Sequence, residues 1–383
     1  MPGLEGVALG ERHGCFDIGF ESGRIASIAA SAGNEPPRWL ALPSFVNFHA
    51  HADRSFASPD ARAASFKDAV AAAKADRATA GINDIRKRAQ RFLSRAASHG
   101  TSRVRTHTDV DAAIGLRAIE GVLAAADAAG DAIDVELVAF ANAAADPAAD
   151  ATRELLTAAV RRGAKLVGGV PALYDRPLAS TASLLALARD LGVDVDLHLD
   201  EHLDAEAAVL ESVVDAVVAH KLEGRVTFSH CCVLAVMNPA AVGRVLQKMA
   251  LARITLSVQP GANLYLQDRG LGSPRRRGIA PLLDALRAGV DLRFGTDNVR
   301  DWFVPFGDAD PLDEARLGML GAHVEDRCQL MAAMCGGRRG LAVGDSADVV
   351  LVPADSFDDA LARRPAGRVL IRGGRVVRPP ADG

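Results

Sequence analysis

Short apolar, β-rich segments alternate with alanine-rich segments along most of the chain. Eight apolar segments predict strands, at residues 44–49, 103–108, 135–141, 165–170, 194–198, 225–230, 253–258 and 291–297. Between them, alanine-rich segments predict helices at residues 113–128, 151–162, 180–191, 205–220, 239–249 and 281–288. This alternation is typical of a parallel sheet with crossover helices, and eight such units favour a closed (β/α)₈ barrel over an open sheet.

The two ends of the chain depart from this pattern. Residues 15–30 predict a hairpin that turns at Ser22 and Gly23, and residues 347–377 predict another strand and hairpin. Two β segments that flank one barrel can pair with each other, so we expect a small β-sandwich built from both ends. The prediction is an α/β protein in three parts: sandwich (1–43), TIM barrel (44–340) and sandwich again (341–383).

Residues 54–95, after the first strand, are helical in character and longer than an ordinary crossover. Two interpretations stay open for this segment. It can form a lid over the mouth of the barrel, or it can form a longer outer helix.

Composition excludes several classes of protein. About half of the 383 residues are hydrophobic and the net charge is -4, which supports a large core and no nucleic-acid surface. No apolar run is long enough for a membrane span, and the first residues lack the pattern of a signal peptide. The five cysteines are odd in number and show no framework spacing, which favours reduced thiols and a cytoplasmic location.

Four of the ten histidines fall at the ends of predicted strands. His49 and His51 end the first strand, where residues two apart point to the same side. His198 ends the fifth strand and His230 the sixth, while Asp297 ends the eighth. Each alone is a weak signal. Together they meet at the end of the barrel where active sites form, so we predict a metal site there.

Three imidazole nitrogens and one carboxylate are donors that suit one divalent metal ion, zinc or ferrous iron, with a position left for water. Such a metal makes hydroxide available near neutral pH. Glu201, on the loop after His198, is the candidate general acid/base. We expect His230 to orient or deprotonate the hydroxide, and Asp297 to ligate the metal and accept a proton.

Four motifs carry a resemblance to a known family: HAH with Asp53 two residues on, HLDE (198–201), SHC (229–231) and GTDN (295–298). In that order, the chain resembles the amidohydrolase superfamily, and within it the bacterial cytosine deaminase branch. The likeness covers nearly the whole chain and includes the segments VRTHTDV (104–110), VELVAF (135–140), LVGGVP (166–171), RRRGIA (275–280) and SADVVLVPA (346–354).

The resemblance implies a hydrolase of C–N bonds other than peptide bonds, which deaminates a cytosine-like nitrogen heterocycle and releases ammonia. It implies one metal ion held by His49, His51, His198 and Asp297, with Glu201 as the proton shuttle. Members of the branch are generally cytoplasmic homo-oligomers that use iron or zinc.

Three departures concern the substrate contacts. The family's Pro-Gln pair after the third strand is Ala141-Asn142 here, and its second aspartate is Asn298. Its pocket tryptophan aligns with Phe303, next to Trp302, and either ring can stack on the substrate. A site built for one hydrogen-bond pattern rejects another, so we expect a ring related to cytosine rather than cytosine itself, such as a substituted pyrimidine, a triazine, a pterin-like base or creatinine.

Other residues carry weaker predictions. His107 and Asp109 either support a metal ligand or pack the barrel. Asn263 and Gln267 are possible substrate contacts. Lys165 falls at the start of its strand, away from the site, which favours one metal ion over two.

Two other functions fit the same motifs. The first is an amidohydrolase that opens a cyclic amide or cleaves an N-substituted heterocycle, since the same attack by hydroxide serves both reactions. The second is a metal-binding protein without activity, which the full set of catalytic positions disfavours.

Overall fold

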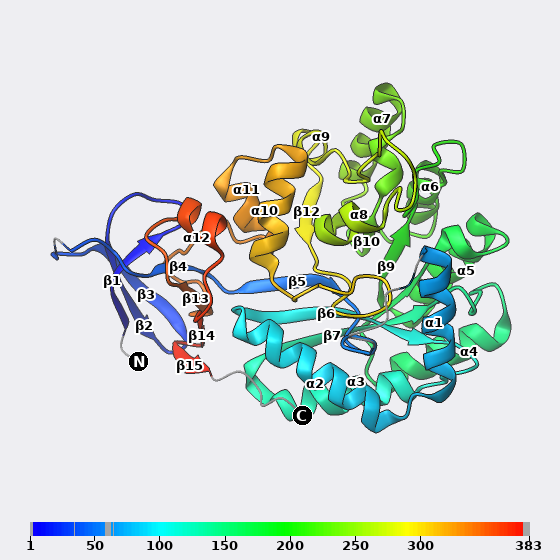
Figure 1. Cartoon of the computed structure of the whole chain (residues 1–383), viewed down its shortest axis with the longest axis horizontal. Helices are drawn as coiled ribbons and strands as arrows, with labels where there is room; N and C mark the ends of the chain where they lie inside the picture. The colour runs from blue at the N-terminus through cyan, green and yellow to red at the C-terminus, as the bar shows by residue number, and fades with distance from the viewer. Residues whose placement is uncertain (1–2, 34, 58–62, 64, 378–383) are drawn as a thin grey trace.

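A computed structural model describes residues 3–33, 35–57, 63 and 65–377. Eight parallel strands form a barrel, and each pairs with the next along the chain. They are β5 (Phe45–Ala50), β6 (Thr101–Val110), β7 (Asp134–Ala141), β8 (Leu166–Gly169), β9 (Asp194–Leu199), β10 (Val226–His230), β11 (Thr255–Val258) and β12 (Asp291–Phe294). The predicted TIM barrel is confirmed (Figure 1).

The barrel closes between its first and last strands. The amide of Asp297 donates to the carbonyl oxygen of His49 at 2.8 Å, and the side chain of Asn47 bonds both the amide and the hydroxyl of Thr296. A β-carbon on Gly295 would lie 2.3 Å from Cβ of His49, so only glycine allows the two strands this close approach. The two metal-site motifs, HAH and GTDN, therefore meet at the closing seam.

Helices cover the outside of the barrel. Four of them begin with proline, at Pro177, Pro239, Pro260 and Pro311, which suits the first helical position because no amide partner is needed there. The helices after β6 are α3 (Arg117–Ala129), α4 (Asp150–Arg162), α5 (Pro177–Leu191), α6 (Leu210–Ala219), α7 (Pro239–Leu251), α8 (Pro260–Leu266), α9 (Leu282–Arg287), α10 (Pro311–Ala322), α11 (Arg327–Met334) and α12 (Phe357–Arg363). Three short 3-10 helices are η1 (Gly130–Ala132), η2 (Pro171–Leu173) and η3 (Cys232–Ala235).

The segment after β5 forms two helices with different positions. Helix α2 (Ile82–Ser98) is an outer helix, and it buries Ile85, Ala89 and Phe92 at helical spacing. Helix α1 (Phe66–Thr79) stands at the carboxyl ends of the barrel strands, on the right in Figure 1. The outer helix is thus found in the second half of residues 54–95, and the first half contributes α1 to the mouth of the barrel, where its role as a lid stays a prediction. Residues 58–62 and 64 lie outside the described part.

The two ends of the chain share one seven-stranded sheet beside the barrel (Figure 1). Its N-terminal strands are β1 (Gly3–Leu9), β2 (Phe16–Glu21), β3 (Arg24–Ala30) and β4 (Leu40–Pro43), and its C-terminal strands are β13 (Val349–Val352), β14 (Val369–Arg372) and β15 (Arg375–Val377). Strand β4 joins the two groups by pairing with β1 and with β13. Both groups also contribute to one apolar core, which contains Ile18, Ile25, Val349 and Ile371.

The predicted union of the two ends is confirmed, while the boundaries at 43 and 340 stay a prediction. Among the described residues, no helix is long and apolar enough to cross a membrane.

Candidate metal centre and active site

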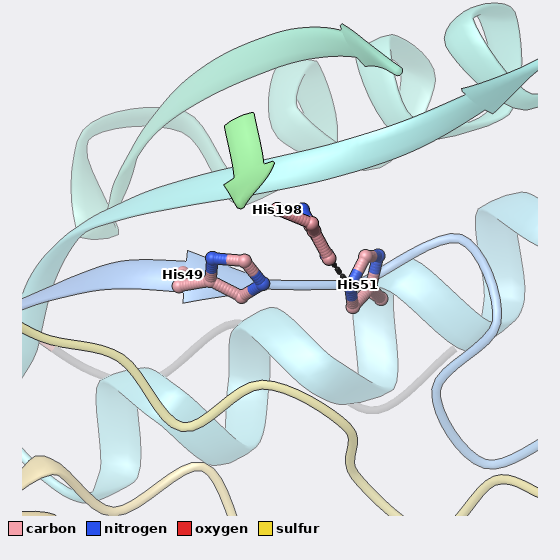
Figure 2. Close-up of side chains that lie close together, drawn as sticks. All are labelled: His49, His51 and His198. Atoms are coloured by element: carbon pink, nitrogen blue, oxygen red, sulfur yellow. Dashed lines mark hydrogen bonds between the residues drawn. The ribbon is translucent and has the colours of Figure 1, made fainter. Parts of the chain in front are cut away.

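Three histidines from two distant strands turn their rings toward one point (Figure 2). His49 lies in β5, His51 follows the end of that strand, and His198 lies in β9. The nitrogen atoms of these side chains can all serve as ligands of one ion, and all three are buried. The register of β5 on β6 shifts between Asn47 and Ala50, so the regular pairing of the strands is interrupted around His49.

Asp297 joins the histidines at the closing seam. Its Oδ1 lies 3.3 Å from Nε2 of His51 and 3.6 Å from Nε2 of His49, while Nε2 of His51 lies 3.2 Å from Nε2 of His198. Four donors placed tetrahedrally around one zinc-sized ion are separated by roughly 3.4 Å. The spacing of the donors thus fits a single divalent metal ion.

The protonation states also fit a metal. Burial lowers the pKa of His49, His51 and His198 well below the usual value of 6.5, so the rings are neutral donors at neutral pH. Nε2 of His49 is buried with no hydrogen-bond partner, which is costly unless an ion occupies the space in front of it.

Neighbouring groups fix the orientation of two of the rings. Nδ1 of His51 lies 3.0 Å from the carbonyl oxygen of His107, so it donates there and Nε2 keeps a free lone pair. Nδ1 of His49 lies 2.9 Å from Oγ of Ser229, which in turn donates to Asp196 at 2.7 Å.

Asp196 is a residue that the sequence analysis missed. It is completely buried in β9, with Arg105 at 2.9 Å and His107 at 3.1 Å. A signal was present, because Asp196 precedes His198 by two residues and so points to the same side of the strand. The ring of His107 thus lies against Asp196, and its carbonyl oxygen accepts from His51. Of the two predictions for His107, this position fits the support of a metal ligand.

Glu201 and His230 lie next to the donor cluster. Oε1 of Glu201 is 3.7 Å from Nδ1 of His230, and the side-chain amide of Asn263 lies 3.0 Å from the same nitrogen. Burial, and second the Asp297 carboxylate, raise the pKa of Glu201 to about 8, against the opposite effect of Arg54. Burial lowers the pKa of His230 to about 4. A buried carboxyl that holds its proton near neutral pH is suited to proton transfer.

The backbone at two of these positions is unusual. His230 has φ +69° and Asp297 has φ +58°, which lie in the left-handed region that favours glycine. His230 is the last residue of β10 and Asp297 lies three residues after the end of β12, so each turns the backbone where its strand gives way to a loop at the mouth of the barrel. Strain of this kind is typical of functional sites.

A cavity of about 570 Å³ lies against the donor cluster. One wall is polar and contains His51, His198, Glu201 and Asp297. The apolar part of its lining contains Phe66, Val70, Leu173, Leu266 and Phe303. Phe66 and Val70 belong to α1, so this helix forms part of the cavity, whose mixed lining is typical of a site for a small, partly polar ligand.

Three of the four predicted substrate contacts line this cavity: Asn142, Asn298 and Phe303. Trp302 does not line it among the described residues, and it packs with Leu266 and Val304 in a small apolar cluster. Asn142 already donates to Asp111 at 3.0 Å and accepts from the amide of Ala144 at 2.9 Å, which limits what it can offer a ligand.

Two other predicted contacts lie behind the cavity. Asn263 contacts His230, as described above, and Gln267 donates to the carbonyl oxygen of Glu201 at 3.4 Å. Lys165 is exposed and precedes β8, so it lies away from the site as predicted. Cys231 and Cys232 are completely buried, and burial raises the pKa of both thiols, which makes them unreactive.

The sequence analysis also missed two arginines of the cavity, Arg54 and Arg77. Arg77, in α1, donates to Asp111 at 2.8 Å and to Asp109 at 3.2 Å, and so ties the helix to the end of β6. Arg54 follows the HAH motif, and its guanidinium lies over the ring of Phe303 at 5.1 Å. Neither residue belongs to a metal or catalytic motif, which explains the omission.

Comparisons with known proteins agree with this site. The sequence profile of the amidohydrolase family matches residues 79–378. The chain is 34% identical to the pterin deaminase of Rhizobium rhizogenes over 357 residues, which cover 88% of this chain and 80% of that protein. It is 26% identical to the N-isopropylammelide isopropyl amidohydrolase of a Pseudomonas species, over 98% of this chain and 96% of that protein.

A solved structure extends the likeness to the fold. The crystal structure of 5-methylcytosine deaminase from Klebsiella pneumoniae with 5-fluorocytosine superposes with a TM-score of 0.88 and 26% identity, covering 98% of this chain and 97% of that one. The chain therefore belongs to the amidohydrolase family and is a hydrolase of carbon–nitrogen bonds other than peptide bonds.

Proposed function

We propose that the protein deaminates a cytosine-like nitrogen heterocycle by hydrolysis, and that its substrate is an amino-substituted ring of the pterin type. The observation that carries the reaction is the position of Glu201, which lines the cavity together with His51, His198 and Asp297 and whose pKa is raised by burial to about 8. The 34% identity to a pterin deaminase supports the bicyclic ring.

The residues present fit one divalent metal ion, zinc or ferrous iron, held by His49, His51, His198 and Asp297. When bound, the metal would supply Lewis acidity, which makes a water molecule acidic enough to ionise near neutral pH. Both ions suit nitrogen and carboxylate donors, and metal analysis of the purified protein would identify the one it carries.

Glu201 moves the proton in the proposed reaction. Water adds its oxygen to the ring carbon that bears the amino group, and one proton of that water passes through Glu201 to the adjacent ring nitrogen. The second proton goes to the amino group, the C–N bond breaks, and ammonia leaves. The product keeps a ring carbonyl in place of the amino group, so atoms and charge balance.

His230 and Asp297 act on the attacking water. Because the pKa of His230 is lowered to about 4, its ring is neutral. Its Nδ1 accepts from the side-chain amide of Asn263, so Nε2 carries the hydrogen and can orient that water by donating to it. Asp297 can accept a proton with the carboxylate oxygen that does not approach His49 and His51. The apolar wall of the cavity holds the flat ring and excludes other water.

One observation favours a second candidate. A relative that aligns with nearly the whole chain is an isopropyl amidohydrolase, and its name indicates an alkylamine leaving group. The same residues can release an alkylamine instead of ammonia, with the proton delivered to the substituted nitrogen.

A substrate panel separates these functions. Zinc-loaded and iron-loaded protein would be assayed with pterin, isocytosine, cytosine, 5-methylcytosine, creatinine and N-alkylated aminotriazines, with ammonia and alkylamine measured separately. We expect ammonia from pterin above all. Alkylamine release alone would support the second candidate, and no release of either product from any ring would refute both.

Glu201→Gln tests the assignment of the proton shuttle. We expect a loss in kcat of about 10²- to 10⁴-fold, because the amide cannot transfer a proton. Metal content, measured on the purified protein, should stay as in the wild type, since Glu201 is not among the donors. The matched control is Glu206→Gln, an exposed glutamate on the same loop, which should keep full activity. Full activity of Glu201→Gln would contradict the assignment.

A further inference from the structure

Arg54 has unused hydrogen-bonding capacity inside the cavity. Its side chain is 12% exposed, and its Nε is buried without a hydrogen-bond partner. The nearest carboxylate oxygens lie at 3.5 Å in Asp301 and at 3.7 Å in Asp109, which are ion-pair distances rather than hydrogen bonds. An unsatisfied charged donor at this depth is expensive unless a ligand completes it.

Arg77 shows what a satisfied arginine looks like in the same cavity. Its Nε and its terminal nitrogen both reach carboxylate oxygens within hydrogen-bond distance, in Asp111 and Asp109. Two of its three nitrogens are therefore engaged by carboxylates. Arg54 differs, because its carboxylate neighbours stay beyond hydrogen-bond distance and more of its donors remain for a ligand.

The surroundings hold the Arg54 guanidinium in one orientation. Its plane lies over the ring of Phe303, and Asp301 and Asp109 flank it. Asp301 is itself fixed, because its other oxygen accepts from the amides of Phe303 and Val304. A donor fixed in this way binds an acceptor without losing further side-chain freedom.

Asn298 and Arg54 both approach Oδ2 of Asp301. Nδ2 of Asn298 donates to Asp301 at 2.7 Å, and because a carboxylate only accepts, the amide carbonyl must face away from it. Asn298 also lines the cavity. The two residues thus present a charged donor and a neutral acceptor to whatever ring enters.

We propose that Arg54 determines specificity by donating a hydrogen bond to an oxo group of the substrate ring, while Asn298 accepts from the neighbouring ring N–H. The proposal rests on the function proposed above and names its substrate class: amino heterocycles that carry a lactam edge, –NH–C(=O)–. Pterin has this edge. A ring in which an amino group replaces the oxo group places a donor against the guanidinium and should be rejected.

The same contact should also affect the rate. Attack at the amino-bearing carbon sends electron density through the ring to the oxo oxygen. A guanidinium beside that oxygen is bound more tightly in the transition state than in the ground state, which raises kcat as well as affinity.

The test compares pterin with 2,4-diaminopteridine, which differs by the replacement of the oxo group. Wild-type protein should prefer pterin by at least about 100-fold in kcat/KM. In Arg54→Met the value for pterin should fall by about 10²- to 10³-fold while that for 2,4-diaminopteridine stays the same, so the preference disappears. Lumazine is the deaminated product of pterin. Its binding to Arg54→Met, measured by calorimetry, should weaken together with kcat/KM for pterin.

Two further variants keep the test decisive. Arg91→Met is the matched control, since Arg91 also lies over a phenylalanine ring, Phe56 at 4.1 Å, but outside the cavity; its kinetics should match the wild type. Arg54→Lys keeps the charge, and if Arg54→Met does not fold, the lysine variant should still show a loss of about 10-fold for pterin alone.

The outcomes distinguish this proposal from the proposed function. Equal losses for both pteridines, or an unchanged preference in Arg54→Met, would overturn the role of Arg54 and leave deamination standing. No turnover of any ring by wild-type protein would refute the deaminase itself. Turnover of both rings at equal kcat/KM by the wild type would also overturn the requirement for an oxo group.

Discussion

A single buried serine links a candidate metal ligand to a charged network. Oγ of Ser229 accepts a hydrogen bond from Nδ1 of His49 and donates one to Asp196. The other carboxylate oxygen of Asp196 accepts a hydrogen bond from Arg105. The chain of contacts fixes the tautomer of His49 and points Nε2 at the metal position. Orientation of a ligand by such a partner is usually worth a factor of ten or more in metal affinity.

Ser229→Ala should therefore weaken metal binding. We expect affinity for zinc to fall by about 10- to 100-fold, because the His49 ring loses the partner that holds it. Competition with a chromophoric chelator measures this directly. Ser102→Ala is the matched control, since Ser102 is also buried and bonds another hydroxyl, that of Ser44, away from the donor cluster. An unchanged affinity in Ser229→Ala would show that the contact does not position His49.

At the scale of single residues, the sequence predicted the candidate metal ligands better than the residues that orient them. His49, His51, His198 and Asp297 stand in motifs at strand ends, so their convergence follows from the barrel alone. Ser229 also stands in a motif, SHC, but its contact with His49 depends on the distance between side chains of separate strands. Arg54 has no such motif, and its contacts depend on distances of the same kind. Trp302 and Phe303 show the same limit, since adjacent residues point to different sides and only the structure distinguishes them.

Helices α8 and α10 meet at an ionisable group that the catalytic mechanism does not use. Glu314, in α10, is buried, and its Oε2 accepts from the amide of Gly261 at 2.8 Å. Burial raises the pKa of this carboxyl well above the usual 4.5. The folded state therefore binds the proton more tightly than the unfolded state does.

The stability of the protein should consequently depend on pH through Glu314. Its contribution is fully present below the ordinary pKa of a glutamate and is lost as the pH rises from there through the raised folded-state pKa. In Glu314→Gln this loss disappears, because the amide keeps a neutral acceptor for Gly261. The free energy of unfolding of the variant should thus exceed that of the wild type by a margin that grows between about pH 5 and about pH 8.

Urea unfolding of both proteins at the two pH values measures this margin. Glu325→Gln, at an exposed position shortly after α10, is the control and should follow the wild type at both. A margin that is constant, or that shrinks with rising pH, would contradict the assignment.

At the scale of elements, periodicity and residue type predicted the barrel well. All eight strands overlap the segments predicted for them. Runs such as VELVAF mark a strand that is buried on both faces, whereas β6 and β9 also carry polar residues. Helices α8, α10, α11 and α12 were not predicted, since they lie in long connections and depend on tertiary contacts for stability. The division of residues 54–95 into α1 and α2 was equally hidden, because both halves have helical sequences.

The whole molecule depends on the attachment of the terminal sheet to the barrel. Arg368, next to β14, is 1% exposed in its side chain and makes two bonds to Asp310, at 2.6 and 2.8 Å. The same guanidinium donates to the carbonyl oxygen of His99, at the end of α2. The pairing of the two chain ends was predictable from their β patterns, but this attachment was not, because it joins residues far apart in sequence.

Arg368→Met should uncouple the two parts of the molecule. Its removal leaves the Asp310 carboxylate without its partner, which costs about 3–5 kcal/mol for a buried pair. We expect the free energy of unfolding in urea to fall by that amount, and the terminal sheet to unfold at a lower urea concentration than the barrel.

Arg372→Met is the matched control, because Arg372 pairs with the mostly exposed Asp134 and such pairs contribute at most about 1 kcal/mol. Since neither arginine lines the cavity, kcat/KM of the folded variants should equal that of the wild type. Equal and small losses in both variants would mean that the sheet is held by its apolar contacts alone.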